Sequence, residues 1–271
     1  MLKRKAYLTI DDSPSERMDD LVDALEMRGV PAVFFCRGDH LEKYFNSAVR
    51  AIEKGFVIAN HSYSHPRSST VSFEVFTEEV KRTQALIDKA YRQAGVNGDP
   101  KLFRFPHMDR GMGGWIIDYD AVPDSQRDLI IRMFADGLNV KLDPPDQAAR
   151  DKKDALQNWL RKEGFVTPEF NGVTFPWYTG TEIGRAVDAM FTYSTADWMV
   201  TARHKGKWPW KSVEDLKAKM DADPWLQKTD SAHVILAHDQ AEIFDETLAL
   251  IDYGLATGME FQSLAQRTPK P

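Results

Sequence analysis

The sequence lacks a pair of cysteines, a long apolar run and an excess of basic residues, and each absence excludes a class of protein. It has a single cysteine, so no intramolecular disulfide can form. It has no apolar run of the ~20 residues that a membrane-spanning helix needs. Its net charge is -6, from 35 Lys and Arg against 41 Asp and Glu, and the basic residues are scattered among the acidic ones. We therefore expect no membrane partner and no nucleic acid partner.

The size and the N-terminal residues favour one globular domain. The 271 residues are 42% hydrophobic and can bury one sizeable core, so we expect a single domain over residues 1–271. A strand pattern begins at Ala6 with no signal-type apolar region before it, which predicts a cytoplasmic protein, or a periplasmic or secreted one if a leader was trimmed. Cys36 lies in the apolar run 32–36 and is expected to be a buried, inert thiol.

Short apolar runs alternate with helical segments in the N-terminal part of the chain. The pattern predicts strands and helices in alternation, with strands at 6–10, 32–36, 56–59 and 101–105 and helices at 40–54 and 73–94. This alternation favours an α/β fold in which a parallel sheet closes like a barrel. Each of the strands ends in polar residues, so we expect the chemistry to gather at one edge of the sheet.

Two of these strand ends carry residues that can bind a metal ion. Asp11 and Asp12 follow the first strand, and His61 and His65 follow the third. The two histidines are four residues apart, so their rings face one point if the chain turns into a helix there. Such a pair can arise by chance, but its position at a strand end favours a site. Two imidazoles and one carboxylate are a Zn²⁺ ligand set that leaves a position open for water, so we expect a hydrolytic metal site on Asp12, His61 and His65.

Five short motifs stand in order along the chain. They are TIDD at 9–12, HSYSHP at 61–66, RFP at 104–106, DW at 197–198 and LAH at 236–238. The residues of these motifs and their order along the chain resemble the motifs of the NodB-type polysaccharide deacetylases, carbohydrate esterase family four. Residues 259–264 are similar to the last strand of that family.

The resemblance implies a distorted (β/α) barrel and a metal-dependent hydrolase that removes acetyl groups from an N-acetylated sugar or oligosaccharide. It implies one divalent ion, Zn²⁺ first with Co²⁺, Ni²⁺ or Mn²⁺ as alternatives, on Asp12, His61 and His65. Asp11 would be the general base and His238 the general acid. Both are needed because an amide carbonyl is weakly electrophilic and its nitrogen leaves badly.

Two further motif residues would support this base and this acid. Arg104 would pair with Asp11 and keep it charged, and Asp197 would orient His238 and keep it protonated. The alternatives are that Arg104 pairs with a surface acid and that Asp197 caps a helix. Asp239 is expected to be such a cap, for a helix over 241–257.

Substrate contacts are also implied by the resemblance. The residue after the third-motif proline would present its N–H to the oxyanion, and here it is His107. Trp198 and Leu236 would form the slot for the acetyl methyl; the alternative for Trp198 is core packing. Phe105 and His107 depart from the family's usual residues, so we expect both to bind substrate and to reshape the pocket. His40, His204 and His233 lie outside the motifs and are expected to have surface or packing roles.

The chain between the third and fourth motifs is longer than is usual in the family. We expect a largely helical inserted subdomain at 113–190, with helices near 123–135 and 147–162 and a loop at 174–177. Because it leaves from the strand end that carries Arg104, it should lie over or beside the catalytic face. There it would restrict the site to short substrates. Its aromatic residues would either stack on sugars or, more simply, fill its own core.

Two other functions stay open at this point. A hydrolase on the same scaffold could cleave a cyclic imide, a ureide or an O-acetyl ester, because a fold does not determine the substrate. A carbohydrate-binding module could keep the fold without the chemistry. The ordered set of metal and acid-base residues argues against that module, since binding alone needs none of them.

Overall fold

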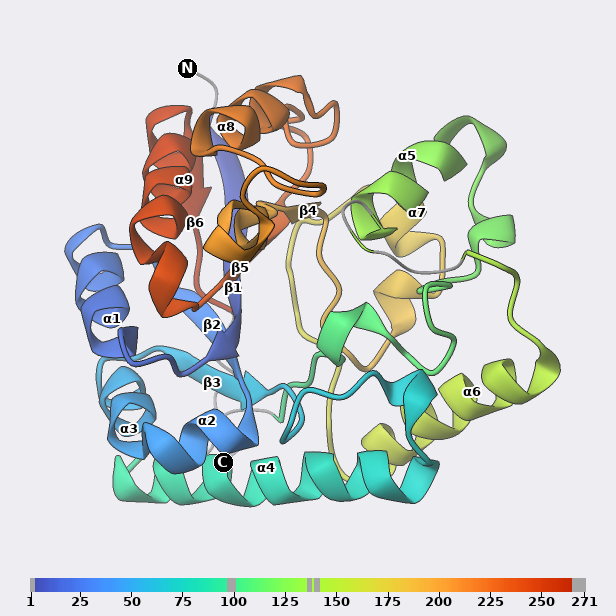
Figure 1. Cartoon of the computed structure of the whole chain (residues 1–271), viewed down its shortest axis with the longest axis horizontal. Coiled ribbons are helices and arrows are strands. Elements are labelled where there is room, and N and C mark those ends of the chain that lie inside the picture. The colour runs from blue at the N-terminus through green and yellow to red at the C-terminus, as the bar shows by residue number, and fades with distance from the viewer. Residues whose placement is uncertain (1–2, 97–100, 136–137, 139–141, 265–271) are drawn as a thin grey trace.

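A computed structural model of the chain describes residues 3–96, 101–135, 138 and 142–264. Within these residues the centre of the molecule is a six-stranded parallel sheet in the order β3-β2-β1-β5-β4, with β6 beside the start of β1 (Figure 1). The strands are β1 (Arg4–Ser13), β2 (Ala32–Cys36), β3 (Val57–Asn60), β4 (Tyr193–Ser194), β5 (His233–His238) and β6 (Met259–Phe261). Because β1 lies between β2 and β5, its carboxyl end stands at the centre of the sheet.

The helices lie in two groups on opposite sides of the sheet (Figure 1). The first group contains α1 (Met18–Met27), α2 (Gly38–Lys43), α3 (Phe45–Glu53), α8 (Val213–Ala222) and α9 (Phe244–Ala256). The second contains α5 (Asp124–Ala135), α6 (Gln147–Lys162) and α7 (Pro176–Thr179). The long helix α4 (Phe73–Gln93) runs from the first group to the second along one end of the molecule. Among the residues described, no helix combines the length and the hydropathy needed to span a membrane.

The strands are buried on both faces, so the sheet separates two apolar cores. Leu8, Phe34 and Ile235 point to one face and pack with side chains of α1, α3 and α9. Their chain neighbours Tyr7 and Phe35 point to the other face and pack with residues of the inserted segment. This alternation follows from the two-residue period of a strand. The insert therefore covers a whole face of the sheet.

Two irregular segments close the open side of the sheet. Residues 101–105 lie beside β3, where the Arg104 N–H donates to the Asn60 carbonyl (3.0 Å). On their other side the Ala189 N–H donates to the Phe103 carbonyl (2.7 Å), and the chain then continues into β4, next to β5. The result is the distorted (β/α) barrel that the motifs implied. The strand predicted at 101–105 is wrong in detail, because the segment forms only isolated bridges.

Residues 113–190, the predicted insert, contribute apolar side chains to the core on this face of the sheet. The helices predicted for the insert are present as α5 and α6, and the loop predicted at 174–177 is partly wrong because α7 begins at Pro176. Most of its aromatic residues are buried: Trp115, Tyr119, Phe134, Phe165, Phe170, Phe175, Trp177 and Tyr178. At the end of the segment, Asp188 forms a buried ion pair with Arg110, which precedes the insert (3.2 Å). These aromatic residues therefore pack mainly in the core, which was the simpler alternative to stacking on sugars.

Candidate active site

Three ligand-type side chains meet at the carboxyl ends of β1 and β3. They are Asp12, at the end of β1, and His61 and His65, in the loop after β3, and their ligand atoms all lie within 4.8 Å of one another. His65 Nε2 is 3.3 Å and His61 Nε2 is 4.0 Å from Asp12 Oδ1. The structure thus brings together the three residues predicted to bind a metal ion.

The two histidines converge through a tight turn and not through the helix on which the prediction was conditional. Ser62 and His65 both adopt left-handed backbone conformations, with φ of 61° and 63°. Glu79 of α4 stabilises the turn, since its Oε2 accepts the backbone N–H groups of Tyr63 (3.1 Å) and Ser64 (2.6 Å). Non-glycine residues in this region cost roughly 1–3 kcal/mol each and gather at functional sites. The turn is therefore held by a residue distant in sequence.

The donor set fits a divalent metal ion. Asp12 Oδ1 is buried and accepts no hydrogen bond from the residues described, while Asp12 Oδ2 accepts one from Gln240 Nε2 (2.9 Å). The Nδ1 of His61 lies 2.8 Å from the Arg104 carbonyl oxygen. A proton on Nδ1 would make that hydrogen bond and leave the Nε2 lone pair for a metal, the usual arrangement of a histidine ligand.

The electrostatics favour the charge states that ligands require. Burial lowers the pKa of His61 and of His65, which keeps the imidazoles neutral. Burial alone would raise the pKa of Asp12, but nearby positive charge, that of the protonated His238 in particular, holds it below its ordinary value. A carboxylate and two neutral imidazoles are the forms that bind a metal ion.

Asp11 lies beside the cluster and is held by a buried arginine. Arg104 Nη1 donates to Asp11 Oδ1 (2.8 Å) and to Thr9 Oγ1 (2.9 Å), and its Nε donates to the Ala189 carbonyl (3.0 Å). The Arg104 side chain is 0% exposed, so it does not belong to a surface ion pair. The second oxygen of Asp11, Oδ2, lies 3.6 Å from His61 Nε2. Asp11 therefore presents Oδ2 to the cluster, while its Oδ1 is bound by Arg104.

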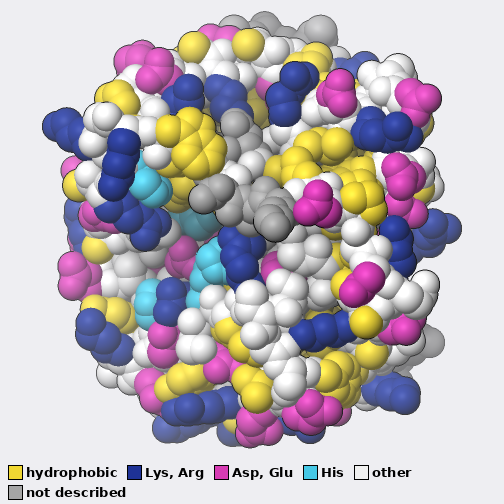
Figure 2. Space-filling view, turned by 45° about the vertical axis from the view of Figure 1, so that its right-hand side comes forward, with side chains coloured by type: hydrophobic (Ala, Val, Ile, Leu, Met, Phe, Trp, Pro, Cys, Tyr) yellow, Lys and Arg dark blue, Asp and Glu magenta, His cyan; other side chains and the backbone are white. Residues whose placement is uncertain are grey.

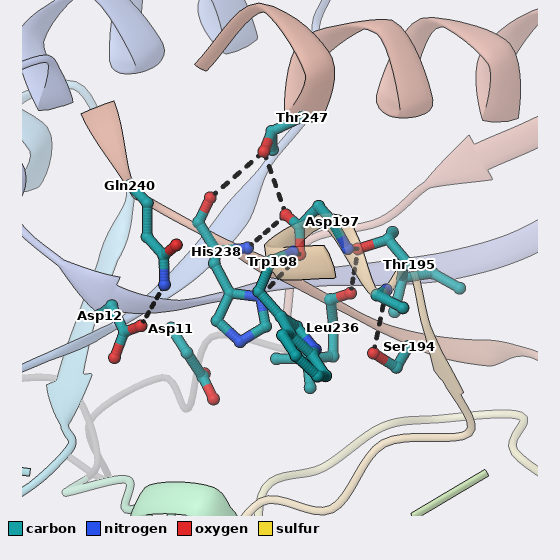
Figure 3. A network of polar contacts seen from close by, with 12 residues as sticks. Asp11, Asp12, Ser194, Thr195, Asp197, Trp198, Leu236, His238, Gln240 and Thr247 are labelled. Carbon is teal, nitrogen blue, oxygen red and sulfur yellow. Dashed lines mark hydrogen bonds and ion pairs between the residues drawn. The ribbon is translucent and has the colours of Figure 1, made fainter. Parts of the chain in front are cut away.

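His238, at the end of β5, is bound through both its ring and its backbone (Figure 3). Its Nδ1 lies 2.7 Å from Asp197 Oδ1, and its backbone N–H donates to Asp197 Oδ2 (2.8 Å). Thr247 of α9 donates to the same Oδ2 (3.0 Å). Burial would lower the pKa of His238, but the Asp197 carboxylate raises it to about 9. The ring is thus protonated at neutral pH and fixed in orientation.

One pocket, with a cavity volume of about 320 Å³, connects these groups. It is lined by most of the residues predicted for the site: Asp11, Asp12, His61, His65, His107, Trp198, Leu236 and His238. Figure 2 shows histidine side chains in a hollow on one face of the molecule, with Lys and Arg side chains near them. The residues predicted to be the base, the acid and the metal ligands therefore open onto one space.

Phe105 was predicted to bind substrate, and this prediction is wrong because Phe105 does not line the pocket. Its side chain is fully buried, and its ring stacks on Phe76 of α4 with centroids 5.5 Å apart. The turn after it, with φ of 54° at His107 and 57° at Met108, brings those two residues to the pocket instead. Phe105 is a core residue.

His107 lies directly against the metal ligands. Its ring packs on the His65 ring with centroids 4.3 Å apart. Burial, with Arg67 nearby, lowers the pKa of His107 to about 4, so it is neutral at pH 7. The role of its backbone N–H at an oxyanion stays a prediction.

Sequence reasoning missed two residues that contact Asp12. Gln240 binds its side chain, as described above, and His40 Nδ1 lies 2.9 Å from its backbone carbonyl oxygen. Gln240 stands two residues after His238, which was the only available signal. His40, expected at the surface or in packing, stands just after β2, one of the strand ends already associated with the chemistry.

One other assignment near the site is wrong, and one gains a further contact. Asp239, predicted to cap the last helix, accepts the Ser15 N–H (2.9 Å) instead, and α9 begins later, at Phe244. This contact and the burial of Asp239 tie the end of β5 to the loop after β1. His204 packs edge-on against Trp198 at 5.5 Å, in agreement with the packing role expected for it, and it also lines the pocket.

The insert contributes a wall of the pocket. Met133 and Phe134 of α5 and Leu138 after it line the same cavity as the metal ligands. Phe134 packs on Phe191, with ring centroids 5.2 Å apart. The insert thus lies beside the site, as its point of departure predicted.

Comparison by sequence identifies relatives of the N-terminal part. Residues 1–111 match the family model described as polysaccharide deacetylase. A peptidoglycan-N-acetylglucosamine deacetylase of Bacillus cereus is 34% identical over 106 residues, which cover 39% of this chain and 37% of that protein. A chitooligosaccharide deacetylase of Rhizobium leguminosarum bv. trifolii is 33% identical over 94 residues, 34% of this chain and 44% of that protein. The alignments therefore span less than half the length of either relative.

Comparison by structure extends to nearly the whole chain. A family 4 carbohydrate esterase from Streptomyces lividans superposes with a TM-score of 0.55 at 17% identity, covering 97% of this chain and 94% of that one. The catalytic domain of a peptidoglycan N-acetylglucosamine deacetylase from Eubacterium rectale gives 0.57 at 17% identity, covering 99% and 94%. At this identity the likeness shows the fold, a distorted barrel of the deacetylase type. The motifs and the match of residues 1–111 agree with this fold, and the N-terminal part of the chain is similar to polysaccharide deacetylases.

Proposed function

We propose that the protein is a metal-dependent hydrolase that removes acetyl groups from an N-acetylated sugar or oligosaccharide. The observation that carries the proposal is the cluster of Asp12, His61 and His65 in one pocket with a held carboxylate and a protonated histidine. The ligand set suits Zn²⁺ best, with Co²⁺, Ni²⁺ and Mn²⁺ as alternatives. The family and the named relatives, which act on N-acetylated glycans, support the substrate class.

The reaction needs a base and an acid at two different atoms. When bound, the metal supplies Lewis-acid polarisation of the acyl oxygen and makes water more acidic. Asp11 Oδ2, the oxygen that Arg104 leaves unoccupied, takes a proton from water as the water oxygen bonds to the acyl carbon. His238 donates its Nε2 proton to the nitrogen as the C–N bond breaks. The products are acetate and a free amino sugar, and proton exchange with solvent then resets both residues.

The positions of the supporting residues suit these roles. Arg104 fixes Asp11, and Asp197 fixes His238 in its protonated form. Trp198 and Leu236 line the pocket beside the acid, where they would receive the acetyl methyl group. The assignment of these roles to Arg104, Asp197, Trp198 and Leu236 is part of the proposal.

The test is metal-dependent acetate release. The purified protein is stripped with a chelator, reloaded with each of the four metals, and assayed on chitin oligomers, a cyclic imide, a ureide and an O-acetyl ester. The proposal expects acetate from the chitin oligomers only in the reloaded protein, and His61→Ala to lose both metal and turnover. Turnover of the imide or ureide without acetate release from any N-acetyl sugar would contradict it. Binding of oligosaccharide without turnover in the reloaded protein would indicate a binding module.

A further inference from the structure

Two exposed tryptophans stand on the segment 203–211, which follows the fourth motif. Trp208 is 66% exposed and Trp210 is 36% exposed, whereas the tryptophans of the insert core are buried. In the part of the chain that is described, neither ring stacks on another aromatic ring. Exposed indole rings of this kind are typical of binding surfaces, because their apolar faces are otherwise left in water.

The hollow beneath these tryptophans adjoins the active-site pocket. Residues 206–211 line it together with Met199, and Met199 also lines the active-site pocket. Arg203 and His204, at the start of the same segment, line the active-site pocket directly. Met199 thus lies between the two hollows, and a chain-like ligand that occupied both would run from the active site past Met199 to the tryptophans.

The segment is basic in a protein of net charge -6. Residues 203–211 contain no acidic residue, and their basic side chains are Arg203, His204, Lys205, Lys207 and Lys211. Arg67, after the second motif, is a further cation that lines the pocket. Among the residues described, no carboxylate pairs with Arg67, Arg203 or Lys207. These cations are therefore available to an anionic ligand.

We propose that residues 203–211, together with Arg67, form a subsite for an acidic N-acetylated oligosaccharide, one that carries carboxylate groups on the sugars next to the N-acetylated one. The inference rests on the proposed function and names its substrate class. Trp208 stacks on the face of a sugar ring, and Lys207 and Arg203 pair with carboxylates on either side. A lipid surface is the less favoured ligand, because a bilayer does not reach Arg67 inside the pocket.

The test is binding, measured by calorimetry on the metal-loaded protein. The probes are a hyaluronan hexasaccharide, in which N-acetylglucosamine alternates with a carboxylate sugar, and an uncharged chitin hexasaccharide. The wild type is expected to bind the acidic probe about tenfold more tightly at low salt, with the preference fading as salt rises. Trp208→Ala is expected to weaken the binding of both probes by roughly fivefold to tenfold. Lys207→Glu should weaken only the binding of the acidic probe, by a similar factor.

The matched control is Lys162→Glu, an exposed lysine of α6 that lines neither hollow and gives the same change in net charge. It should bind the acidic probe like the wild type. The proposal is wrong if Trp208→Ala and Lys207→Glu also bind that probe like the wild type. It is equally wrong if they keep binding it and instead lose binding to phosphatidylserine vesicles. Binding needs no turnover, so failure of acetate release from every N-acetyl sugar would refute the proposed function without altering this result.

Discussion

Asp197 uses both carboxylate oxygens to hold His238, one on the ring Nδ1 (2.7 Å) and one on the backbone N–H (2.8 Å). The second oxygen also accepts a hydrogen bond from Thr247 (3.0 Å), and Asp197 is fully buried. A buried carboxylate with this geometry fixes the ring and favours its protonated form. The acid of the proposed reaction thus depends on a residue 41 positions away in sequence.

Replacing Asp197 should therefore change the pH dependence of the reaction. The carboxylate raises the pKa of His238 to about 9, so the acid form persists to that pH and the rate falls above it. In Asp197→Asn the pKa of His238 falls, the alkaline limb of the kcat profile moves to lower pH, and kcat drops by about a hundredfold or more. Initial rates across pH 5–10 measure both effects.

A suitable control is Asp215→Asn, which removes an exposed carboxylate that caps α8. Its alkaline limb should coincide with that of the wild type. If the alkaline limb of the kcat profile is also unchanged in Asp197→Asn, His238 does not supply the proton.

Arg104 should be essential to stability as well as to turnover. Arg104→Met leaves the buried Asp11 without its cation and removes the donor to Thr9 and Ala189. The loss of one partner of a buried ion pair costs about 3–5 kcal/mol. Urea unfolding should show this loss, whereas Arg92→Met, an exposed arginine at the end of α4, should unfold like the wild type. A wild-type midpoint for Arg104→Met would refute the importance of the pair.

Gln240 should tune the affinity for metal, because it orients one oxygen of Asp12 (2.9 Å). Loss of a residue that positions a metal ligand typically weakens binding by about 10–100-fold, so Gln240→Leu should raise the Kd for Zn²⁺ by that factor. Competition with a chromogenic chelator gives the value. Gln147→Leu, at the exposed start of α6, should keep the wild-type Kd. Equal affinities in the two variants would exclude this role of Gln240.

The insert should limit substrate length, since Met133 forms part of the pocket wall. Met133 is only half-buried, so Met133→Ala should widen the pocket at little cost in stability. The ratio of kcat/KM for a chitin hexamer to that for a dimer should rise in this variant. Met27→Ala, on the far helix α1, should leave the ratio unchanged. Equal turnover of polymers and dimers by the wild type would show that the insert does not limit substrate length.

The sequence alone predicted the elements whose bounds depend on local pattern. The bounds predicted for β2 and α6 agree with those observed, and Cys36 is buried as expected. The predicted meeting of Asp12, His61 and His65 is also observed, because parallel strands place their carboxyl ends at one edge.

The wrong predictions concern features set by distant residues. The turn at the two histidines depends on Glu79 in another helix, so the four-residue spacing alone suggested a helix. The predicted helix over 40–54 is broken at Tyr44 into α2 and α3. Phe105 stands in a functional motif, yet its packing on Phe76 is visible only once α4 is in place. Gln240 has only a weak signal, its position two residues after His238, because it contacts Asp12 at the end of a different strand.

The most direct test of the central claim compares metal content with acetate release in Asp11→Asn. Asp11 is not among the three predicted ligands, and its Oδ1 is bound to Arg104, so the variant should keep about one metal ion per chain. Without its base it should release acetate from chitin oligomers at least about a hundredfold more slowly than the wild type. Acetate release at the wild-type rate by the metal-loaded variant would contradict the assignment of the base and, with it, the proposed mechanism.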